Sequence, residues 1–355
     1  MKRTIIVLLM ASWAVAASAA ERTKVYQQHF ETNPQTSLKL TTEFGRIDIQ
    51  TWDSAAVDIK VELCVSTRSE RRAEDWINSV MVNLHMDGNV VKATVDKVSK
   101  ERFVVTSFRG DDVKINNVFT VRMPKGMDIE IDHRHGNINF DELTGLVGIR
   151  LKYGNLKANR LTRGRTQQLN TLVLAYGRAD IGEVGWLSAE VAYSKIGIES
   201  AQALALESKY STVRVGTLGS LACESRYDTY KLGHLDKLTG QSSYTHMALG
   251  SLAQHMSMEM RYGELTVNRV MQGFGQLQCE GHYTGIDINF DPQSDFAYEL
   301  RTRYGAIDTR RLELRSSQHH SSSSSTYMNG RVGHAKAKGA VKLSTEYAHI
   351  YLDTI

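Results

Sequence analysis

The pattern that most constrains the fold is a tyrosine that recurs at a nearly fixed interval. Glu-Ser-Lys-Tyr at residues 207–210 returns as Glu-Ser-Arg-Tyr at residues 224–227, seventeen residues later. A fixed period near twenty residues is typical of a solenoid or another repeat array. Phe44 and His135 occupy the same sequence context, so the pattern begins early and is interrupted once. The tyrosines that share this context are Tyr153, Tyr176, Tyr193, Tyr210, Tyr227, Tyr244, Tyr262, Tyr283, Tyr304 and Tyr347.

Apolar residues alternate with polar ones on both sides of each tyrosine. Around Tyr210 they are Leu204 and Leu206 before the ring, and Val213 and Val215 after it. Steps of two indicate strands, because a helix would repeat every three or four residues. Glycine, serine or aspartate usually follows the tyrosine, which is the chemistry of a turn at a corner. Each repeat therefore predicts two short strands joined at corners, with alternate side chains facing inward.

These repeats predict an all-β protein that is a single-stranded parallel β-helix, or β-solenoid. The tyrosine spacings give rungs of about 17–23 residues. One rung cannot bury its own apolar face, whereas rungs stacked about 4.8 Å apart share a continuous core and pair their backbones. A leucine-rich repeat fits less well, since the repeats have no helix-forming half. A propeller would need blades of about forty residues.

Three segments are expected along the chain. Residues 1–20 read as a signal peptide, with Lys2 and Arg3 before an apolar stretch and small residues at the end. An N-terminal membrane anchor is the alternative. Residues 21–130 are expected to form an N-terminal cap over the open end of the solenoid. Residues 131–355 are expected to form the solenoid repeats, with a serine-rich irregular segment at residues 316–326.

The expected cap contains one rung, one helix and a hairpin strand. Residues 41–65 read as a rung, with inward residues that include Ile47, Ile49 and Ile59. Residues 69–82 have helical spacing, and Ser69 is the expected N-cap. The stretch "MDGNVVKATVDK" predicts a turn followed by a strand.

Charge and cysteine content exclude several classes. The net charge is +4, or +2 without Lys2 and Arg3 (43 − 2 − 39), which is too small to indicate nucleic-acid binding. No later apolar run is long enough for a transmembrane segment, so we expect the mature chain to be exported to the periplasm or cell surface. The chain has three cysteines, an odd number that does not suggest a disulfide framework. Cys223 and Cys279 share an inward column about 14 Å apart, too far for a disulfide bond.

Two charged columns are candidate ligand sites. An acidic residue lies three positions before most of the central tyrosines, and a basic residue often lies one position before them. Alternation places both columns on the outer face. Stacked like charges repel one another, and a basic column two residues away relieves that repulsion. One interpretation is a charge-compensated solvent face; the other is a ladder that binds a cation or an anionic glycan. The candidate ladder residues are Glu190, Glu207, Glu224, Glu259, Glu280, Lys209, Arg226 and Arg261.

No motif in the chain predicts catalysis, and we expect no catalytic, cofactor-binding or metal-binding residue. Nucleophile-elbow, Walker, His-Glu-x-x-His and Cys-x-x-Cys patterns do not occur. Asp132, His133 and His135 are the densest titratable group, but alternation places both histidines with apolar residues and predicts a packed corner. His319 and His320 would face opposite ways in a strand, so a loop is favoured over a metal site.

The segment "VFTVRMPKGMDIEIDHRHGNINF", followed by "YGNLKA", "YGRADI" and "YGELTV", resembles a known family. This is the DUF-type β-strand-repeat "putative adhesin" family of bacterial envelope proteins, related to head-GIN-domain "putative autotransporter adhesins". The resemblance covers residues 40–355 and implies a parallel, right-handed β-helix in an exported protein. It supplies no catalytic or binding residues. The serine-rich segment departs from the family pattern.

Three functional hypotheses follow. The first is a non-enzymatic, exported envelope β-solenoid, adhesin-like or scaffolding, which binds a glycan or a protein along its sheet faces. The second is a carbohydrate-active β-helix enzyme, similar to a polysaccharide lyase, which predicts a groove with clustered carboxylates. The third is a periplasmic accessory of envelope signalling, which predicts a membrane-protein partner.

Overall fold

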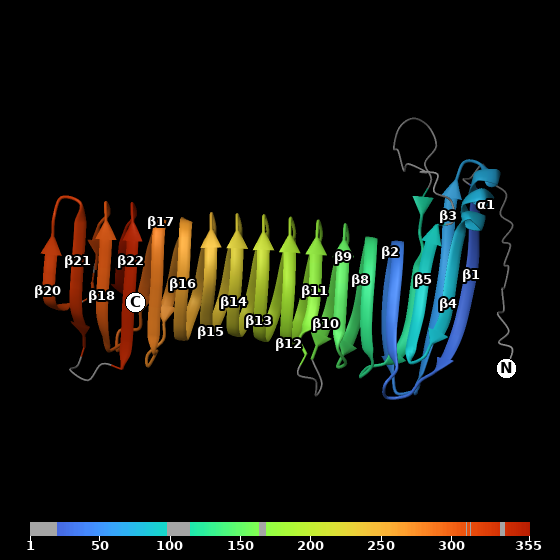
Figure 1. Ribbon diagram of the computed structural model, residues 1–355, viewed down its shortest axis with the longest axis horizontal. Coiled ribbons are helices and arrows are strands. Elements are labelled where there is room, and N and C mark those ends of the chain that lie inside the picture. The colour runs from blue at the N-terminus through green and yellow to red at the C-terminus, as the bar shows by residue number, and fades with distance from the viewer. Residues whose placement is uncertain (1–19, 98–113, 163–167, 310, 313, 334–337) are drawn as a thin grey trace. The chain divides into compact units, whose positions relative to one another are not determined.

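The computed structural model describes residues 20–97, 114–162, 168–309, 311–312, 314–333 and 338–355. The chain divides into two compact units, Met1–Ile181 and Gly182–Ile355, and each is described by itself. Both consist almost entirely of strands (Figure 1). The predicted signal peptide lies outside the described residues, apart from Ala20. Within the described part of the chain, no helix has the length and apolar character needed to span a membrane.

Parallel strands form the repeats of unit 1. β2 pairs with β8, β8 pairs with both β9 and β10, and β9 pairs with β11, in each case parallel. Alternate side chains such as Leu38, Leu40, Ile47 and Ile49 are buried, because they line the inside of the stack. The bounds are β2 (Ser37–Trp52), β8 (Asp128–Leu143), β9 (Val147–Lys152), β10 (Asn155–Leu161) and β11 (Asn170–Ala175).

Two strands extend the edge of β2 in parallel, and antiparallel strands continue from each of them. β5 pairs with the first half of β2 and with β4, whereas β7 pairs with the second half of β2 and with β3. β3 pairs with β1 and β6 as well. The prediction of one rung at residues 41–65 was therefore wrong. Only β2 is a rung, and β3 belongs to the antiparallel edge. The strands are β1 (Ala20–Glu31), β3 (Ala56–Thr67), β4 (Val80–Asp87), β5 (Val90–Lys97), β6 (Lys114–Ile115) and β7 (Val118–Pro124).

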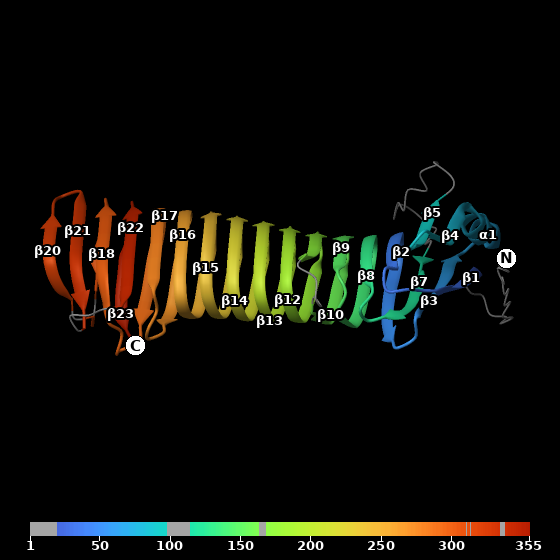
Figure 2. The same cartoon turned by 60° about the horizontal axis from the view of Figure 1, so that its bottom comes forward.

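Helix α1 (Glu70–Ser79) packs against β1 and β3 (Figure 2). The Ser69 side chain accepts a hydrogen bond from the Arg72 backbone N–H, which confirms the predicted N-cap. Ala73, Trp76 and Ile77 form the buried face. The helix ends before the predicted Val82, because Val80 has extended backbone angles and begins β4.

The rungs of unit 2 are long parallel strands. Each residue pairs with the equivalent residue of the next repeat. Lys195 of β13 pairs with Thr212 of β14, which pairs with Thr229 of β15. One lap is thus seventeen residues, and this confirms the predicted β-solenoid. Each of these laps is one continuous strand rather than two short ones. The strands are β12 (Arg178–Ala192), which crosses the division between the units, β13 (Lys195–Lys209), β14 (Thr212–Arg226), β15 (Thr229–Ser243), β16 (His246–Val270) and β17 (Gln276–Phe290).

The last rung of the chain does not lie last in space. β22 (Gly339–Glu346) pairs in parallel with β17 on one side and with β18 (Phe296–Arg303) on the other. β23 (Ile350–Thr354) likewise pairs with β17 and with β19 (Ile307–Asp308). Figure 1 shows β22 between the two earlier strands. The C-terminal rung is therefore inserted between two rungs that precede it in the sequence.

The serine-rich segment is a hairpin, not the irregular segment that we expected. β20 (Arg315–Ser321) and β21 (Ser325–Val332) pair antiparallel, and β21 pairs antiparallel with β18. Its exposed polar side chains gave no alternation that distinguishes a strand from a loop. Backbone pairing, which is independent of side-chain polarity, determines the strands here.

Buried polar groups accompany the apolar core of unit 2. The Asp228 carboxylate is 3% exposed and accepts hydrogen bonds from the Ser211 backbone N–H at 2.6 Å and from the Ser208 and Ser225 hydroxyls at 2.7 and 2.8 Å. These donors offset the cost of burying a carboxylate. Cys223 and Cys279 are free and buried, as predicted, and burial raises the pKa of each thiol to about 12.

Candidate functional site

A residue with left-handed backbone geometry turns the chain at each aromatic corner. Phe44, His135 and the ten repeat tyrosines all have φ values between 50° and 61°. An aromatic L-residue pays on the order of 1 kcal/mol for this conformation. In exchange, each ring stacks on its neighbour: the centroids of Tyr210 and Tyr227 are 4.8 Å apart and the planes differ by 1°. Ring stacking recovers a similar energy.

The stacking order follows space rather than sequence. In unit 2, Tyr283 stacks on Tyr347 at 4.7 Å, and Tyr347 stacks on Tyr304 at 4.9 Å. In unit 1, His135 stacks between Phe44 and Tyr153 and is exposed. The packed-corner prediction thus holds for His133, which is fully buried, and was wrong for His135. Simple alternation fails there because the left-handed residue reverses the direction of the side chain.

The tyrosine rings of unit 2 present their edges to solvent. Each is between 45% and 50% exposed, although rings within the row, such as those of Tyr210, Tyr227 and Tyr244, are covered on both faces by the neighbouring rings. A row of ring edges and phenol hydroxyls therefore runs across the rungs. Between the two ends of this row, no ring has a free face on which a ligand could stack.

The predicted acidic and basic columns lie on the outer face of unit 2. Glu190, Glu207, Glu224, Glu259 and Glu280 are exposed, and so are Lys209, Arg226 and Arg261. A shallow groove of about 360 Å³ follows the start of the acidic column, past Glu190, Glu207, Glu224 and Gln241. Across the described part of unit 2, the salt bridges join none of these eight residues to one another. Their role as a ligand ladder remains a prediction.

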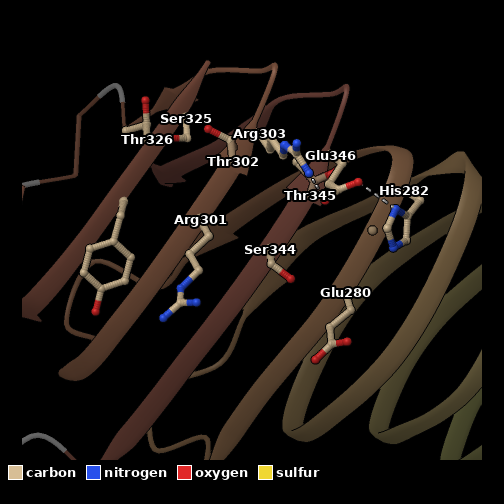
Figure 3. Close-up of a pocket in the computed structure, with 12 residues that line it drawn as sticks. Glu280, His282, Arg301, Thr302, Arg303, Ser325, Thr326, Ser344, Thr345 and Glu346 are labelled. Carbon is tan, nitrogen blue, oxygen red and sulfur yellow. Dashed lines mark ion pairs between the residues drawn. The ribbon is translucent and has the colours of Figure 1, made fainter. Parts of the chain in front are cut away.

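A second, larger pocket of about 510 Å³ lies where the inserted strand β22 meets its neighbours (Figure 3). The pairing of β17, β22, β18 and β21 places Glu280, Ser344, Arg301 and Tyr327 side by side. The acidic column therefore ends at Glu280. The same position on the next three strands is occupied by Ser344, Arg301 and Tyr327. The regular charge pattern of the outer face is interrupted at this pocket.

Charged contacts orient the side chains of this pocket. Glu346 lies 3.3 Å from His282 and 3.8 Å from Arg303, so one carboxylate serves two basic groups. The Arg301 guanidinium lies 2.9 Å from Glu299 and 4.9 Å from the centroid of the Tyr327 ring. An arginine held on two sides loses little side-chain freedom when it binds a carboxylate or another anion. The hydroxyls of Ser325, Thr326 and Ser344 complete the lining.

This pocket was missed in the sequence, although it left a signal there. Arg301 stands three residues before Tyr304, where the repeats of Tyr193, Tyr210, Tyr227, Tyr262 and Tyr283 have glutamate. Glu346 stands one residue before Tyr347, where the repeats of Tyr210, Tyr227, Tyr262 and Tyr304 have lysine or arginine. Both departures lie in the last two repeats. Their meaning depends on the insertion of β22, which brings Ser344 between Glu280 and Arg301.

Histidine and carboxylate clusters do not point to a metal site. The described residues include no group of three or more histidine, cysteine, aspartate or glutamate side chains that would hold a metal ion. His319 and His320 lie on the hairpin strand β20, with Met328 and Tyr327 opposite them.

Of the comparisons with known proteins, only the search of solved structures found matches. No family model and no curated protein matches the chain. Solved structures that are similar include a "putative cell adhesion protein" of Clostridium sporogenes, with 9% identity, a TM-score of 0.18, and coverage of 94% of this chain and 100% of that one. A "putative adhesin" of Bacteroides fragilis has 10% identity, a TM-score of 0.29, and coverage of 94% and 97%. One of Parabacteroides distasonis has 8% identity, a TM-score of 0.27, and coverage of 75% and 93%. With scores this low, the likeness carries no conclusion about function.

Proposed function

We propose that the protein is a non-enzymatic, exported protein of the bacterial cell envelope that acts as an adhesin-like binding scaffold. Its ligand is a glycan or a protein held on the outer sheet face. The observation that carries this proposal is the pocket at β22, where an oriented arginine, two carboxylates and several hydroxyls interrupt an otherwise regular face. Pockets of several hundred Å³ with a few convergent polar groups are typical of ligand sites.

The chemistry of the pocket favours binding over catalysis. Glycan-cleaving enzymes that use two carboxylates keep one of them protonated by an apolar setting. Here Glu280 is exposed, and Glu346 lies beside His282 and Arg303, so neither carboxylate has an apolar setting. Arg301 and the hydroxyls suit a sugar that carries a carboxylate, with the guanidinium paired to that group.

A glycan-binding screen tests the proposal. Immobilised neutral and acidic oligosaccharides are probed with the purified protein and with its Arg301→Ala variant. We expect acidic sugars to be retained and Arg301→Ala to weaken that binding by about tenfold, the loss typical of one charge-assisted contact. Lys237→Ala, which removes an exposed cation of β15, is the matched control and keeps full binding. Equal binding by Arg301→Ala and the unchanged protein would exclude the pocket as the site.

Two further measurements separate the alternatives. Release of unsaturated uronic acids from polysaccharides, abolished by Glu224→Gln, would support the lyase hypothesis instead. Protease treatment of intact and lysed cells addresses location: cleavage on intact cells supports a surface adhesin. Protection until lysis supports the periplasmic accessory, and crosslinking then identifies its partner.

A further inference from the structure

The tyrosine corner of unit 2 carries a strip of cations. We define the corner strip as residues 192–197, 209–214, 226–231 and 243–248, which surround Tyr193, Tyr210, Tyr227 and Tyr244. Its strands are paired in register, so the strip runs straight across four rungs. Its basic side chains are all exposed: Lys195, Lys209, Arg214, Arg226 and Lys231. Three of these cations, Lys195, Arg214 and Lys231, lie outside the columns that the sequence singled out.

These five cations have no acidic partner within the corner strip. Its one carboxylate, Asp228, is 3% exposed and is held by hydroxyl and backbone donors. Throughout the described residues, no salt bridge involves any of the five cations, whereas basic residues elsewhere in unit 2 do pair, as Arg269 does with Asp291 at 2.6 Å. Cations without partners are available to an external anion.

Glutamates border the corner strip without neutralising it. Glu207 and Glu224 lie two residues before Lys209 and Arg226, on the side away from the tyrosines. A ligand seated over the tyrosine edges is therefore nearer to the cations than to the glutamates. The nearer cations contribute more to the Coulomb energy of an anionic ligand than the farther glutamates do, and because the charges are exposed, binding will depend strongly on salt.

The repeat of the corner strip suits an extended polymer. Adjacent tyrosine centroids are 5.0, 4.8 and 4.6 Å apart, so the phenol hydroxyls recur with a period close to the length of one sugar unit in an extended glycan chain. Lys209 pairs in register with Arg226, and Arg214 with Lys231, so these cations share that spacing. Proteins that bind single-stranded nucleic acid stack bases on free aromatic faces. Here the ring faces are covered by other rings, and only edges and hydroxyls are offered. The chemistry thus favours a polysaccharide over a nucleic acid.

We propose that the tyrosine corner of unit 2 binds a linear acidic polysaccharide, whose carboxylates or sulfates pair with Lys195, Lys209, Arg214, Arg226 and Lys231 while its hydroxyls contact the phenol edges. The chain of the ligand runs across the rungs, parallel to the tyrosine row. This site is distinct from the pocket at β22 and does not depend on it.

Binding of polymers of different charge tests the proposal. The full-length protein is titrated with polygalacturonate, dextran sulfate, neutral dextran and single-stranded DNA at two salt concentrations. We expect the two acidic polysaccharides to bind, neutral dextran not to bind, and the affinity to fall steeply with salt. The double variant Arg214→Ala, Lys231→Ala should bind about tenfold more weakly, with a shallower salt dependence, because two ion contacts are lost.

Matched variants make the result specific to the corner strip. Lys237→Ala combined with Lys342→Ala removes two exposed cations elsewhere in unit 2 and should leave the affinity unchanged. Tyr227→Phe keeps the stacked ring, removes one hydroxyl and should weaken binding by about twofold to fivefold. Preference for carboxylated over sulfated polymer identifies the anion.

Three results would overturn the proposal. They are equal binding of neutral dextran, tighter binding of single-stranded DNA than of either polysaccharide, and an unchanged affinity in the folded Arg214→Ala, Lys231→Ala variant. Arg301→Ala serves to separate the two sites. The titrations are repeated in the Arg301→Ala background, where the pocket at β22 no longer contributes, and the loss caused by Arg214→Ala, Lys231→Ala should persist there. Failure of the pocket then leaves this proposal standing, and failure of the strip leaves the pocket standing.

Discussion

At the scale of single residues, the repeat tyrosine turns the backbone at a corner and also stacks its ring on the rings of neighbouring rungs. The turn is costly for a tyrosine, whereas the stack requires one. Its left-handed backbone is unfavourable for a side chain with a Cβ atom, and glycine would adopt it at no steric cost. Tyr210 is nevertheless kept at such a corner, with neighbouring rings 5.0 and 4.8 Å away. The stack, which glycine cannot form, compensates for the backbone cost.

The buried thiols of unit 2 make a prediction about alkaline pH. Burial raises the pKa of Cys223 and Cys279 from 9.0 to about 12, so the folded state keeps protons that the unfolded state releases. Stability is therefore fully present below pH 9.0 and is lost as the pH rises from 9.0 towards about 12. We expect the free energy of unfolding of unit 2 to fall by up to about 1.4 kcal/mol per pH unit for each thiol in that window.

Urea unfolding between pH 7 and pH 11 measures this effect. Cys223→Ala and Cys279→Ala should each reduce the slope above pH 9, even though each starts from a lower stability because of the cavity it leaves. Burial also raises the pKa of Tyr230, which contributes in the same direction above pH 10.0. A slope that neither cysteine variant alters would contradict this origin.

At the scale of elements, the first corners of the repeat depend on a close backbone approach. In unit 1, glycine follows the aromatic residue at Gly136, Gly154 and Gly177. A Cβ atom at Gly154 would lie 1.7 Å from the Gly136 carbonyl oxygen, which is far inside contact distance. Successive rungs can stack at this corner only because no side chain stands between them.

Gly154→Ala should therefore destabilise unit 1. We expect a loss of about 2–4 kcal/mol in the free energy of unfolding, since backbone atoms must move apart to admit the methyl group. Gly126→Ala is the control, because its Cβ would meet only the Thr144 hydroxyl at 3.7 Å and its backbone is not left-handed. The control should be neutral or slightly stabilising. Thermal unfolding of both variants tests for the clash at Gly154. Equal melting temperatures of Gly154→Ala and Gly126→Ala would show that the added methyl group causes no clash.

At the scale of the whole molecule, each unit has antiparallel strands added to its parallel repeats. In unit 1 these are β4 beyond β5, and β3 and β1 beyond β7; in unit 2 they are β21 and β20 beyond β18. An exposed edge of a parallel stack invites pairing with other chains, and added strands that are short, polar or twisted reduce that risk. The inserted C-terminal rung ties the hairpin of unit 2 to the central rungs.

Weakening β22 should release the end of unit 2 without unfolding its centre. The Leu343 side chain is buried in the core, whereas Lys342 beside it is exposed. We expect Leu343→Asp to make residues 296–332 sensitive to limited proteolysis while β13–β17 stay protected, since solenoid stability is a sum of neighbouring contacts. Lys342→Asp should keep the native cleavage pattern. Uniform cleavage of all rungs in Leu343→Asp would show that the unit unfolds as a single cooperative block.

The sequence by itself determined the solenoid, its seventeen-residue lap, the inward columns that include Leu206 and Cys223, and the N-cap at Ser69. These features are local: the strand period and the repeat length are written in consecutive residues, and burial of alternate apolar side chains follows from them. The exposure of the glutamate column follows from the same alternation.

Only the tertiary structure decided which strands are neighbours. The antiparallel course of β3, the hairpin at β20 and β21, and the insertion of β22 between β17 and β18 all depend on backbone pairing, which carries no side-chain signature. The pocket at β22 exists because of that insertion, and the free cations of the tyrosine corner became visible only when their distances to every carboxylate were fixed. Alternation along one strand determines which way a side chain points. It does not determine which strand lies beside it, because any exposed edge can hydrogen-bond to any other of suitable length.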